Sequence, residues 1–266
     1  YPYQSLYQLG FANGLENGVY IEEMANQGLK WETQVSTDVA IEFGLFDRLT
    51  GSVEYFKKDS KDLLFDVSQP ASMGVTSIVQ NIGKVSNSGV EIDLSYDVIK
   101  GKNWNLTVGA NATFIKNKIV ELPEEMKKDG YIDGSKKWFE GKSIYEFWLR
   151  QWYGVDPATG NGLYYADMEK NSMDDKNFAK TVVNLNGETL TNDYNYAKYD
   201  YSGASIPKVF GGFNFRLGYK NFDLAATFSY QLGGKVLDAQ YASMMGVQEY
   251  GYAQSPDLLK AWQKPG

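Results

Sequence analysis

Acidic side chains at alternate positions are the first feature of this chain that could do chemistry. Glu91, Asp93 and Asp97 are separated by even numbers of residues, so in an extended strand they share one face. A glycosidase needs two carboxylates about 5 to 10 Å apart, one as general acid and one as base or nucleophile. A hydrated strand surface shows the same alternation, and we favour that interpretation. We predict that these three side chains, with Arg216, line a wet interior.

Two residue types that carry much of enzyme chemistry do not occur. The sequence has no His and no Cys, which excludes Ser-His-Asp catalysis, imidazole and thiolate metal ligands, and disulfides within this stretch. The segment DPATGNG from Asp156 to Gly162 lacks the acidic spacing of a calcium loop and is predicted to be a turn. We therefore expect no enzyme activity, no catalytic residue, no metal site and no cofactor. The net charge of −7 argues against nucleic acid as a partner.

Aromatic residues gather in the segment from 116 to 206. Their flat faces stack on sugar rings and anchor protein interfaces, so the segment could contact a ligand or a lid. The alternative is that the segment packs against itself. The candidate contacts are Trp138, Trp148, Trp152, Tyr153, Tyr164 and Tyr165.

Alternation of apolar and polar side chains identifies the elements that must position these groups. Residues 90–98 place apolar side chains at even positions and mostly polar ones at odd positions, and residues 104–114 do the same. Similar pairs of strands are predicted on either side of the turn Leu45–Arg48 and of the two-residue turn Lys220-Asn221. The sequence thus predicts three hairpins, and the chain is expected to be all-β.

The length of these strands favours a membrane barrel over a soluble domain. Strands of roughly nine to thirteen residues exceed the usual five or six and match tilted membrane strands. Short turns alternate with long connections, as in outer-membrane barrels. From Trp104 to Phe114 the strand would rise about 25 Å along a membrane normal at a tilt of about 40°, so terminal aromatics mark two interfaces. A soluble carbohydrate-binding β-sandwich remains the alternative, because its inward faces also alternate.

Several motifs resemble one family in the order in which that family has them. They are GLKWETQVSTDVAIEFGLFDRLTGSVEYFKKDSKDLLF (28–65), QNIGKVSNSGVEIDLSYDVI (80–99), GVDPATGNGLYY (154–165) and IPKVFGGFNFRLGYKNFDLAATFSYQLGGKV (206–236). Together they look like the SusC/RagA family of TonB-dependent transporters.

The resemblance implies a fold, a location and partners. It implies an antiparallel barrel of roughly 22 strands in the outer membrane of Bacteroidota-type bacteria, with this chain supplying about six of them. The cargo would be an oligosaccharide of a polysaccharide-utilisation system, or a peptide in some members. A SusD-like lipoprotein would cap the extracellular mouth, and the TonB complex would supply energy. A passive porin would share the periodic features but would lack a plug and a TonB box.

The resemblance also divides the chain. We expect a loop over residues 1–31, two hairpins over 32–115, a long extracellular loop over 116–206, a hairpin over 207–232 and a final loop over 233–266. No signal peptide, plug domain or TonB box is recognisable in the sequence. We therefore expect this chain to be part of the C-terminal half of one barrel domain.

Overall fold

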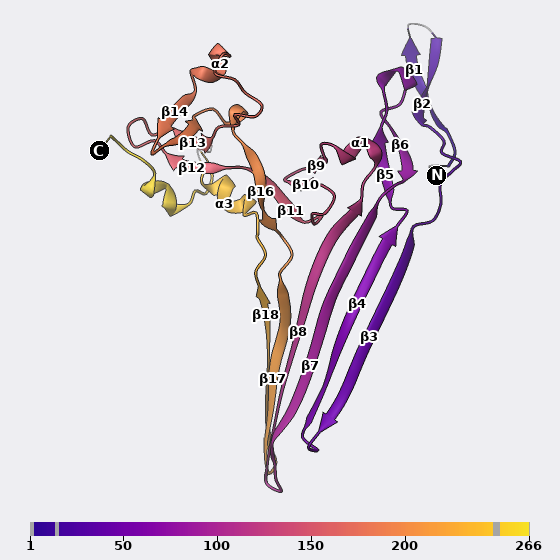
Figure 1. The fold of residues 1–266 in the computed structure, drawn as a ribbon, viewed down its shortest axis with the longest axis vertical. Coiled ribbons are helices and arrows are strands. Elements are labelled where there is room, and N and C mark those ends of the chain that lie inside the picture. Colours follow the sequence, from indigo (N-terminus) through magenta and orange to yellow (C-terminus); the bar gives the residue numbers. More distant parts are fainter. Residues whose placement is uncertain (1–2, 14–15, 247–250, 266) are drawn as a thin grey trace. The chain divides into compact units, whose positions relative to one another are not determined.

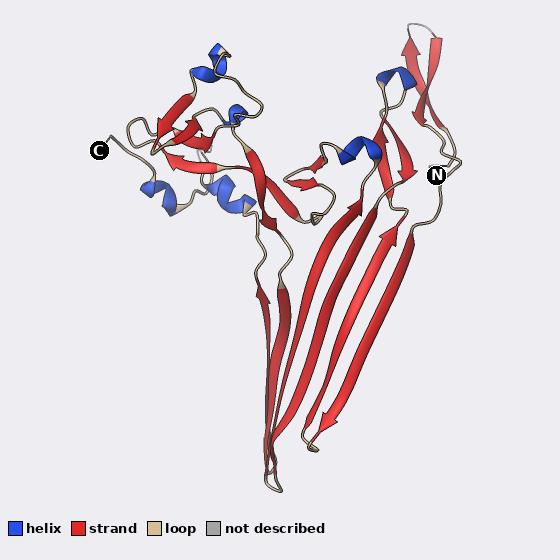
Figure 2. Ribbon diagram, viewed as in Figure 1, coloured by secondary structure: helices blue, strands red, loops and turns tan. Residues whose placement is uncertain are grey.

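The computed structural model describes residues 3–13, 16–246 and 251–265, and β-strands dominate it (Figure 2). The chain divides into two compact units. We call residues 1–133, 137–145 and 206–234 the strand unit, and residues 134–136, 146–205 and 235–266 the insert unit. None of the described helices could cross a bilayer, since the longest α-helix, α3 (Ala239–Met244), has six residues.

A six-stranded antiparallel sheet forms the body of the strand unit, with the order β18-β17-β8-β7-β4-β3 (Figure 1). This arrangement confirms the three predicted hairpins. The strands have between 11 and 18 residues, well above the usual length in globular proteins. Their bounds are β3 (Thr33–Leu45), β4 (Leu49–Lys61), β7 (Lys84–Lys100), β8 (Trp104–Glu121), β17 (Val209–Tyr219) and β18 (Phe222–Leu232).

The register of the sheet collects the apolar side chains on one face. Across the strands, Val53 lies opposite Ile41 and Ile92, and Ile92 lies opposite Ala112. Near the short turns, Trp104 pairs with Tyr219, their ring centroids 4.1 Å apart, and Tyr219 pairs with Phe222. The aromatic row that the sequence predicts at this end is therefore continuous across three strands.

No second layer covers this apolar face among the described residues of the strand unit. Ile41 is 69% exposed and Leu224 57%, values that a soluble β-sandwich would not show on its inner face. Covering such a face is favourable, because apolar surface transferred out of water gains about 25 cal/mol per Å². The described residues of the strand unit thus do not supply the second sheet that a sandwich has.

Two details of the strands differ from the sequence prediction. A bulge at Val98 shifts the register between Asp97 and Ile99, so β7 continues to Lys100 and the turn is shorter than predicted. Strand β8 continues to Glu121 and pairs with β7 along this extension. The charged residues of this extension suggest a loop when the sequence is considered alone. Lysines nevertheless fit a strand that continues beyond the apolar band of the sheet.

The loop after β8 binds back to that strand at its far end. The Gly141 N–H donates to the Ile119 carbonyl, 2.9 Å, and the Ile119 N–H donates to the Lys142 carbonyl, 2.8 Å. Asn117, which is buried, accepts from Ser143 Oγ at 2.8 Å and from the Ile144 N–H at 2.9 Å. Strand β17 pairs with β8 only as far as Phe114, so this loop satisfies the edge of β8 beyond that point.

Smaller elements extend the strand unit beyond its sheet. Residues 1–31, where the sequence predicts a loop, contain two paired strands, and another hairpin follows β4. The bounds are β1 (Leu6–Asn13), β2 (Glu16–Glu23), β5 (Leu64–Ser68), η1 (Ala71–Met73), β6 (Ser77–Asn81), α1 (Glu124–Lys127) and β9 (Tyr131–Asp133). Strand β10 (Lys136–Trp138) follows β9.

Most of the residues predicted as one long loop belong to a folded insert unit. Its larger sheet has the order β12-β13-β15-β14, and β11 pairs with β16. Leu163, Phe178 and Leu190 are completely buried and form its core. The bounds are β11 (Glu146–Arg150), β12 (Trp152–Val155), β13 (Gly162–Tyr165), α2 (Lys176–Ala179), β14 (Val182–Leu185), β15 (Glu188–Thr191), η2 (Tyr194–Tyr196), β16 (Tyr199–Ala204) and η3 (Pro256–Lys260).

The hydroxyl of Thr191 links three segments of this core. It is fully buried, donates to Thr181 Oγ1 at 2.8 Å and accepts from the Asp193 N–H at 3.1 Å. Asp193 in turn caps η2, because its carboxylate accepts from the Asn195 N–H at 2.9 Å. The position of Tyr194 therefore depends on this network.

Arginine at an apolar position of β8 should destabilise the sheet in lipid. We expect Val108→Arg in the complete protein to cost about 2 to 4 kcal/mol, because the guanidinium would face hydrocarbon. Thr113→Arg is the matched control, since Thr113 lies on the opposite face across from Glu91. The measurement is the temperature at which the folded band is lost in semi-native electrophoresis. Equal losses at both positions would contradict the assignment of the faces.

Removal of the Thr191 hydroxyl should loosen the insert unit locally. Thr191→Val keeps the shape of the side chain but leaves the Asp193 N–H unpaired, at a cost of about 1 to 3 kcal/mol. Hydrogen exchange of the complete protein should show faster exchange in β14, β15 and η2. Thr189→Val is the control, because no hydrogen bond of the Thr189 side chain occurs among the described residues. Unchanged exchange in Thr191→Val would refute the role of the network.

Candidate functional site

The polar face of the sheet holds the charged residues that the sequence analysis selects. Glu91, Asp93 and Asp97 follow one another at alternate positions of β7, opposite Thr113, Asn111 and Thr107 of β8. Thr107 lies opposite Arg216 of β17, so all four charged residues share the face that carries no apolar row. That this face lines a wet interior stays a prediction.

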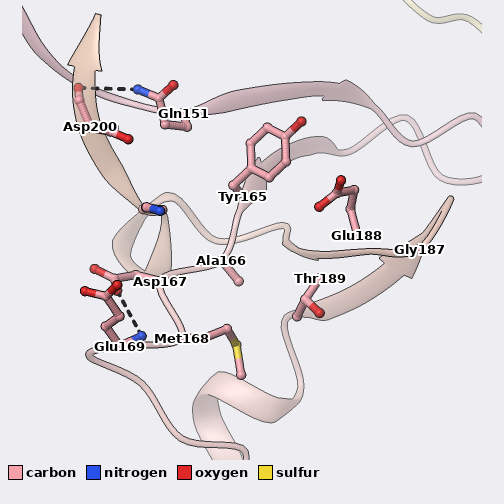
Figure 3. A pocket seen from close by; sticks show the side chains of 11 residues that line it. Gln151, Tyr165, Ala166, Asp167, Met168, Glu169, Gly187, Glu188, Thr189 and Asp200 are labelled. Atoms are coloured by element: carbon pink, nitrogen blue, oxygen red, sulfur yellow. Dashed lines mark hydrogen bonds between the residues drawn. The ribbon is translucent and has the colours of Figure 1, made fainter.

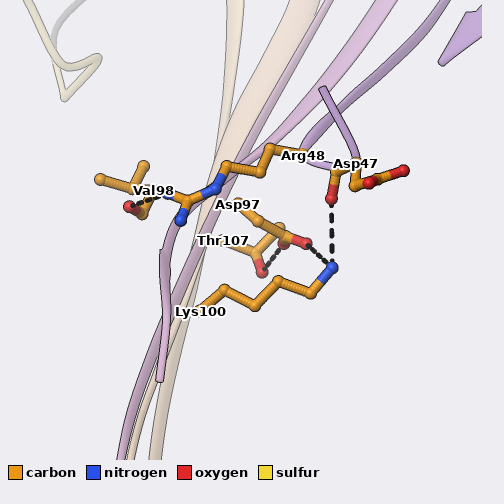
Figure 4. Close-up of polar contacts among 6 residues, drawn as sticks. All are labelled: Asp47, Arg48, Asp97, Val98, Lys100 and Thr107. Carbon is orange, nitrogen blue, oxygen red and sulfur yellow. Dashed lines mark hydrogen bonds and ion pairs between the residues drawn. The ribbon is translucent and has the colours of Figure 1, made fainter. Parts of the chain in front are cut away.

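Asp97 belongs to a polar network at the short turns (Figure 4). Its carboxylate accepts from Thr107 Oγ1 at 2.7 Å and lies 3.9 Å from Lys100 Nζ. Lys100 donates to the Asp47 carbonyl at 3.1 Å, and Arg48 donates to the Val98 carbonyl at 3.4 Å. The network joins the β3–β4 turn to the end of β7. Asp97 thus has a partner within the sheet at each carboxylate oxygen.

In the described ranges 3–13, 16–246 and 251–265, no three Asp or Glu side chains lie close enough together to hold a metal ion. The DPATGNG segment forms the predicted turn instead. The Asp156 carboxylate accepts from Thr159 Oγ1 at 2.7 Å and from the Ala158 N–H at 2.9 Å. These bonds, the one from Thr159 first, lower the pKa of Asp156 below its ordinary value.

Trp262 packs over this turn. Its Nε1–H donates to the Pro157 carbonyl at 3.1 Å, and its ring covers Gly160 so closely that a Cβ there would lie 2.4 Å from it. Gly160 also has a φ of +77°, which favours glycine. The turn at residues 156–162 and Trp262, which follows η3, therefore pack closely against each other.

The candidate aromatic contacts belong to separate groups. Trp138 of β10 lies edge-on to Phe65 at 5.7 Å and contributes to a cavity of about 370 Å³ in the strand unit. Trp152 packs on Tyr164 at 5.1 Å, and Tyr153 packs on Tyr165 at 5.6 Å, in both pairs at nearly right angles. Because neighbouring residues of a strand alternate, these two pairs lie on opposite faces of the β12–β13 hairpin. Self-packing therefore accounts for part of each ring, as the alternative interpretation predicts.

Tyr165 borders a cavity of about 510 Å³ in the insert unit (Figure 3). Its polar walls come from segments far apart in the sequence. Gln151 Nε2 donates to Ser202 Oγ at 3.2 Å and to the Asp200 carbonyl at 3.4 Å. The other polar side chains of the wall are Asp167, Glu169, Glu188, Thr189, Lys198 and Asp200.

Hydrogen-bond acceptors outnumber donors in this cavity. Asp167 is buried, accepts from two backbone N–H groups at 3.3 Å and pairs with Lys170 at 3.6 Å. The side chains of Glu169 and Glu188 make no hydrogen bond or ion pair among the described residues, so their oxygens are available to a ligand. A ligand with several O–H donors and a flat ring face would match one tyrosine ring and these acceptors. Of the wall, the sequence analysis selected only Tyr165.

A second surface lies on the β11–β16 pair, where Trp148 stands opposite Tyr201 and Arg150 opposite Tyr199. The Trp148 ring lies 4.8 Å from Tyr201 and 6.2 Å from Tyr199. The Arg150 guanidinium lies 5.0 Å from the ring of Tyr199 and 4.9 Å from the ring of Tyr194. Burial, followed by the charges of Glu146 and Asp200, raises the pKa of the Tyr201 phenol. We call these five side chains the arginine face. Trp148 is the one member that the sequence analysis selected.

The comparisons with known proteins agree with this geometry. Residues 2–240 match the family model described as TonB dependent receptor-like, beta-barrel. TonB-dependent receptor P3 of Formosa agariphila is 29% identical over 258 residues, which are 92% of this chain and 24% of that protein. TonB-dependent receptor SusC of Bacteroides thetaiotaomicron is 25% identical over 202 residues, 75% of this chain and 19% of that protein.

Among solved structures, that of the RagAB peptide transporter is similar, with a TM-score of 0.79 and 25% identity. The match covers 99% of this chain and 28% of that one. The chain thus spans about a quarter of the length of the relatives it matches. With the open apolar face, the family match excludes a soluble sandwich. The chain belongs to the TonB-dependent receptor β-barrel family, and its six long strands are part of the wall of an outer-membrane β-barrel.

Proposed function

We propose that the complete protein imports an oligosaccharide across the outer membrane by TonB-coupled transport. The family match and the likeness to a receptor named SusC support TonB-dependent transport. The two unlike faces of the sheet support a wall between lipid and a hydrated lumen, with Glu91, Asp93, Asp97 and Arg216 on the hydrated side.

The cavity beside Tyr165 is the observation that best supports an oligosaccharide as the cargo. Sugars present many O–H donors around an apolar ring face, which calls for acceptors and an aromatic surface together. The cavity offers both, with its acidic side chains, the Gln151 amide and the Tyr165 ring. Trp138, Trp148, Trp152, Tyr153 and Tyr164 lie outside it and would contact cargo or lid elsewhere. A SusD-like lipoprotein at the extracellular mouth, and TonB acting through a region outside this sequence, complete the proposal.

A peptide cargo is the second candidate. The observation in its favour is the similar structure titled as the RagAB peptide transporter. A peptide backbone brings one N–H donor per residue and no ring face of its own, whereas a sugar unit brings several O–H donors for the carboxylates together with a ring face for Tyr165. Oligosaccharide is therefore the cargo we favour. A passive porin would need no energy coupling, which makes it separable by experiment.

Uptake by the source cells tests cargo and coupling together. Cells that lack the gene should lose uptake of a fluorescent oligosaccharide, and the complete gene should restore it only while TonB and the proton gradient are intact. Tyr165→Ala should weaken binding by the purified complete protein about tenfold, as loss of an aromatic contact predicts. Tyr252→Ala is the control, because Tyr252 is an exposed tyrosine of the insert unit that lies outside the cavity wall and outside the candidate contacts.

Three other outcomes would contradict parts of the proposal. Uptake that survives loss of the gradient would indicate a passive pore. Loss of peptide uptake alone would assign a peptide cargo. Equal effects of the two substitutions would remove the cavity from the site.

A further inference from the structure

The arginine face holds the guanidinium of Arg150 in a defined position. Tyr194 and Tyr199 hold the Arg150 guanidinium at 4.9 and 5.0 Å from their ring centroids. Arg150 Nε donates to the Tyr194 carbonyl at 2.9 Å, which fixes the plane of the group. Attraction between the cation and the two rings adds to that hold. The side chain is therefore restrained at its inner nitrogen and across its faces.

The outer edge of the same guanidinium has no protein partner in the described part of the chain. The hydrogen bonds of Arg150 there involve Nε alone, and no carboxylate lies within ion-pair distance. Arg150 is exposed, so both terminal nitrogens can be reached from solvent. An arginine that only packed against the rings would be expected to keep a mobile head group, since long charged side chains otherwise retain rotamer entropy.

A planar group that accepts two parallel hydrogen bonds is the natural ligand for that edge. A carboxylate fits this description, and a restrained guanidinium loses little further freedom when it binds one. Residues 116–206 contain no other arginine, which makes Arg150 the distinctive anion-binding group of the segment. The flanking rings of Trp148 and Tyr194 provide surface on which a sugar ring could rest.

We infer that Arg150 binds the carboxylate of a uronic acid unit, so that the imported oligosaccharide is an acidic one. This inference rests on the proposed oligosaccharide import and narrows its cargo. The cavity beside Tyr165 is lined with carboxylates and suits the uncharged units of the same chain of sugars. A cargo with carboxylates on only some of its units would match both surfaces.

Paired ligands that differ only in charge test the inference. Short oligomers of glucuronate, galacturonate, mannuronate and guluronate would each be titrated calorimetrically into the complete protein, beside their carboxyl-reduced neutral forms. At least one acidic oligomer should bind about tenfold or more tightly than its neutral form, as expected for a charge-assisted bidentate contact. Arg150→Gln should abolish that difference, so that the acidic oligomer binds no more tightly than its neutral form.

Two further variants separate the contact from general effects of charge and folding. Lys180→Gln changes the charge of the insert unit equally, at an exposed lysine outside both surfaces, and should keep the preference. Arg150→Lys keeps the charge but not the planar edge, and should lose most of the preference for the acidic oligomer. The inference fails if no acidic oligomer is preferred, or if the preference survives Arg150→Gln. Absence of binding by both the acidic and the neutral oligomers would count against the proposed oligosaccharide import itself.

Discussion

Backbone hydrogen bonding in a medium without water is the constraint on which the strand unit depends. Within hydrocarbon each N–H and C=O must be paired inside the protein, which only helices and closed barrels achieve. The sheet meets this demand by unbroken antiparallel registers, such as the eleven paired positions between Val209–Tyr219 and Phe222–Leu232. Tight turns keep the pairing continuous at one end, and a returning loop pairs with the upper part of β8. In a closed barrel the outer edges of β3 and β18 pair with further strands.

The same constraint explains which parts of the fold the sequence predicts. A strand with unlike solvents on its two faces must alternate strictly, so period two identifies the three hairpins and the Lys220-Asn221 turn. The bulge at Val98 cannot be predicted from the sequence, because it shifts the register of β7 against β8 without changing the residue types of the strand. The end of β8 beyond Phe114 is not predicted either. Its lysines lie beyond the apolar band of the sheet, where one face of the strand no longer needs apolar side chains.

The insert unit follows different rules and is less predictable. Its strands have only four to six residues, and its core depends on contacts between distant segments, such as Trp262 with Pro157 and Gln151 with Ser202. Aromatic composition indicates that the segment matters but does not reveal which rings share a surface. Trp148 and Tyr165 prove to lie on different surfaces, and the polar residues beside them, Arg150 and Glu188, have no local signature.

The point at which the chain leaves the sheet has a consequence for how such a protein changes over generations. Phe114 of β8 and Val209 of β17 are direct partners, and β8 continues beside β7 to Glu121, so the chain between Glu121 and Val209 leaves and rejoins the same pair of neighbouring strands. A segment anchored in this way can be lengthened, shortened or replaced by recombination without moving any strand out of register. The inserted segment can thus diverge from one generation to the next while the strands of the wall keep their pairing.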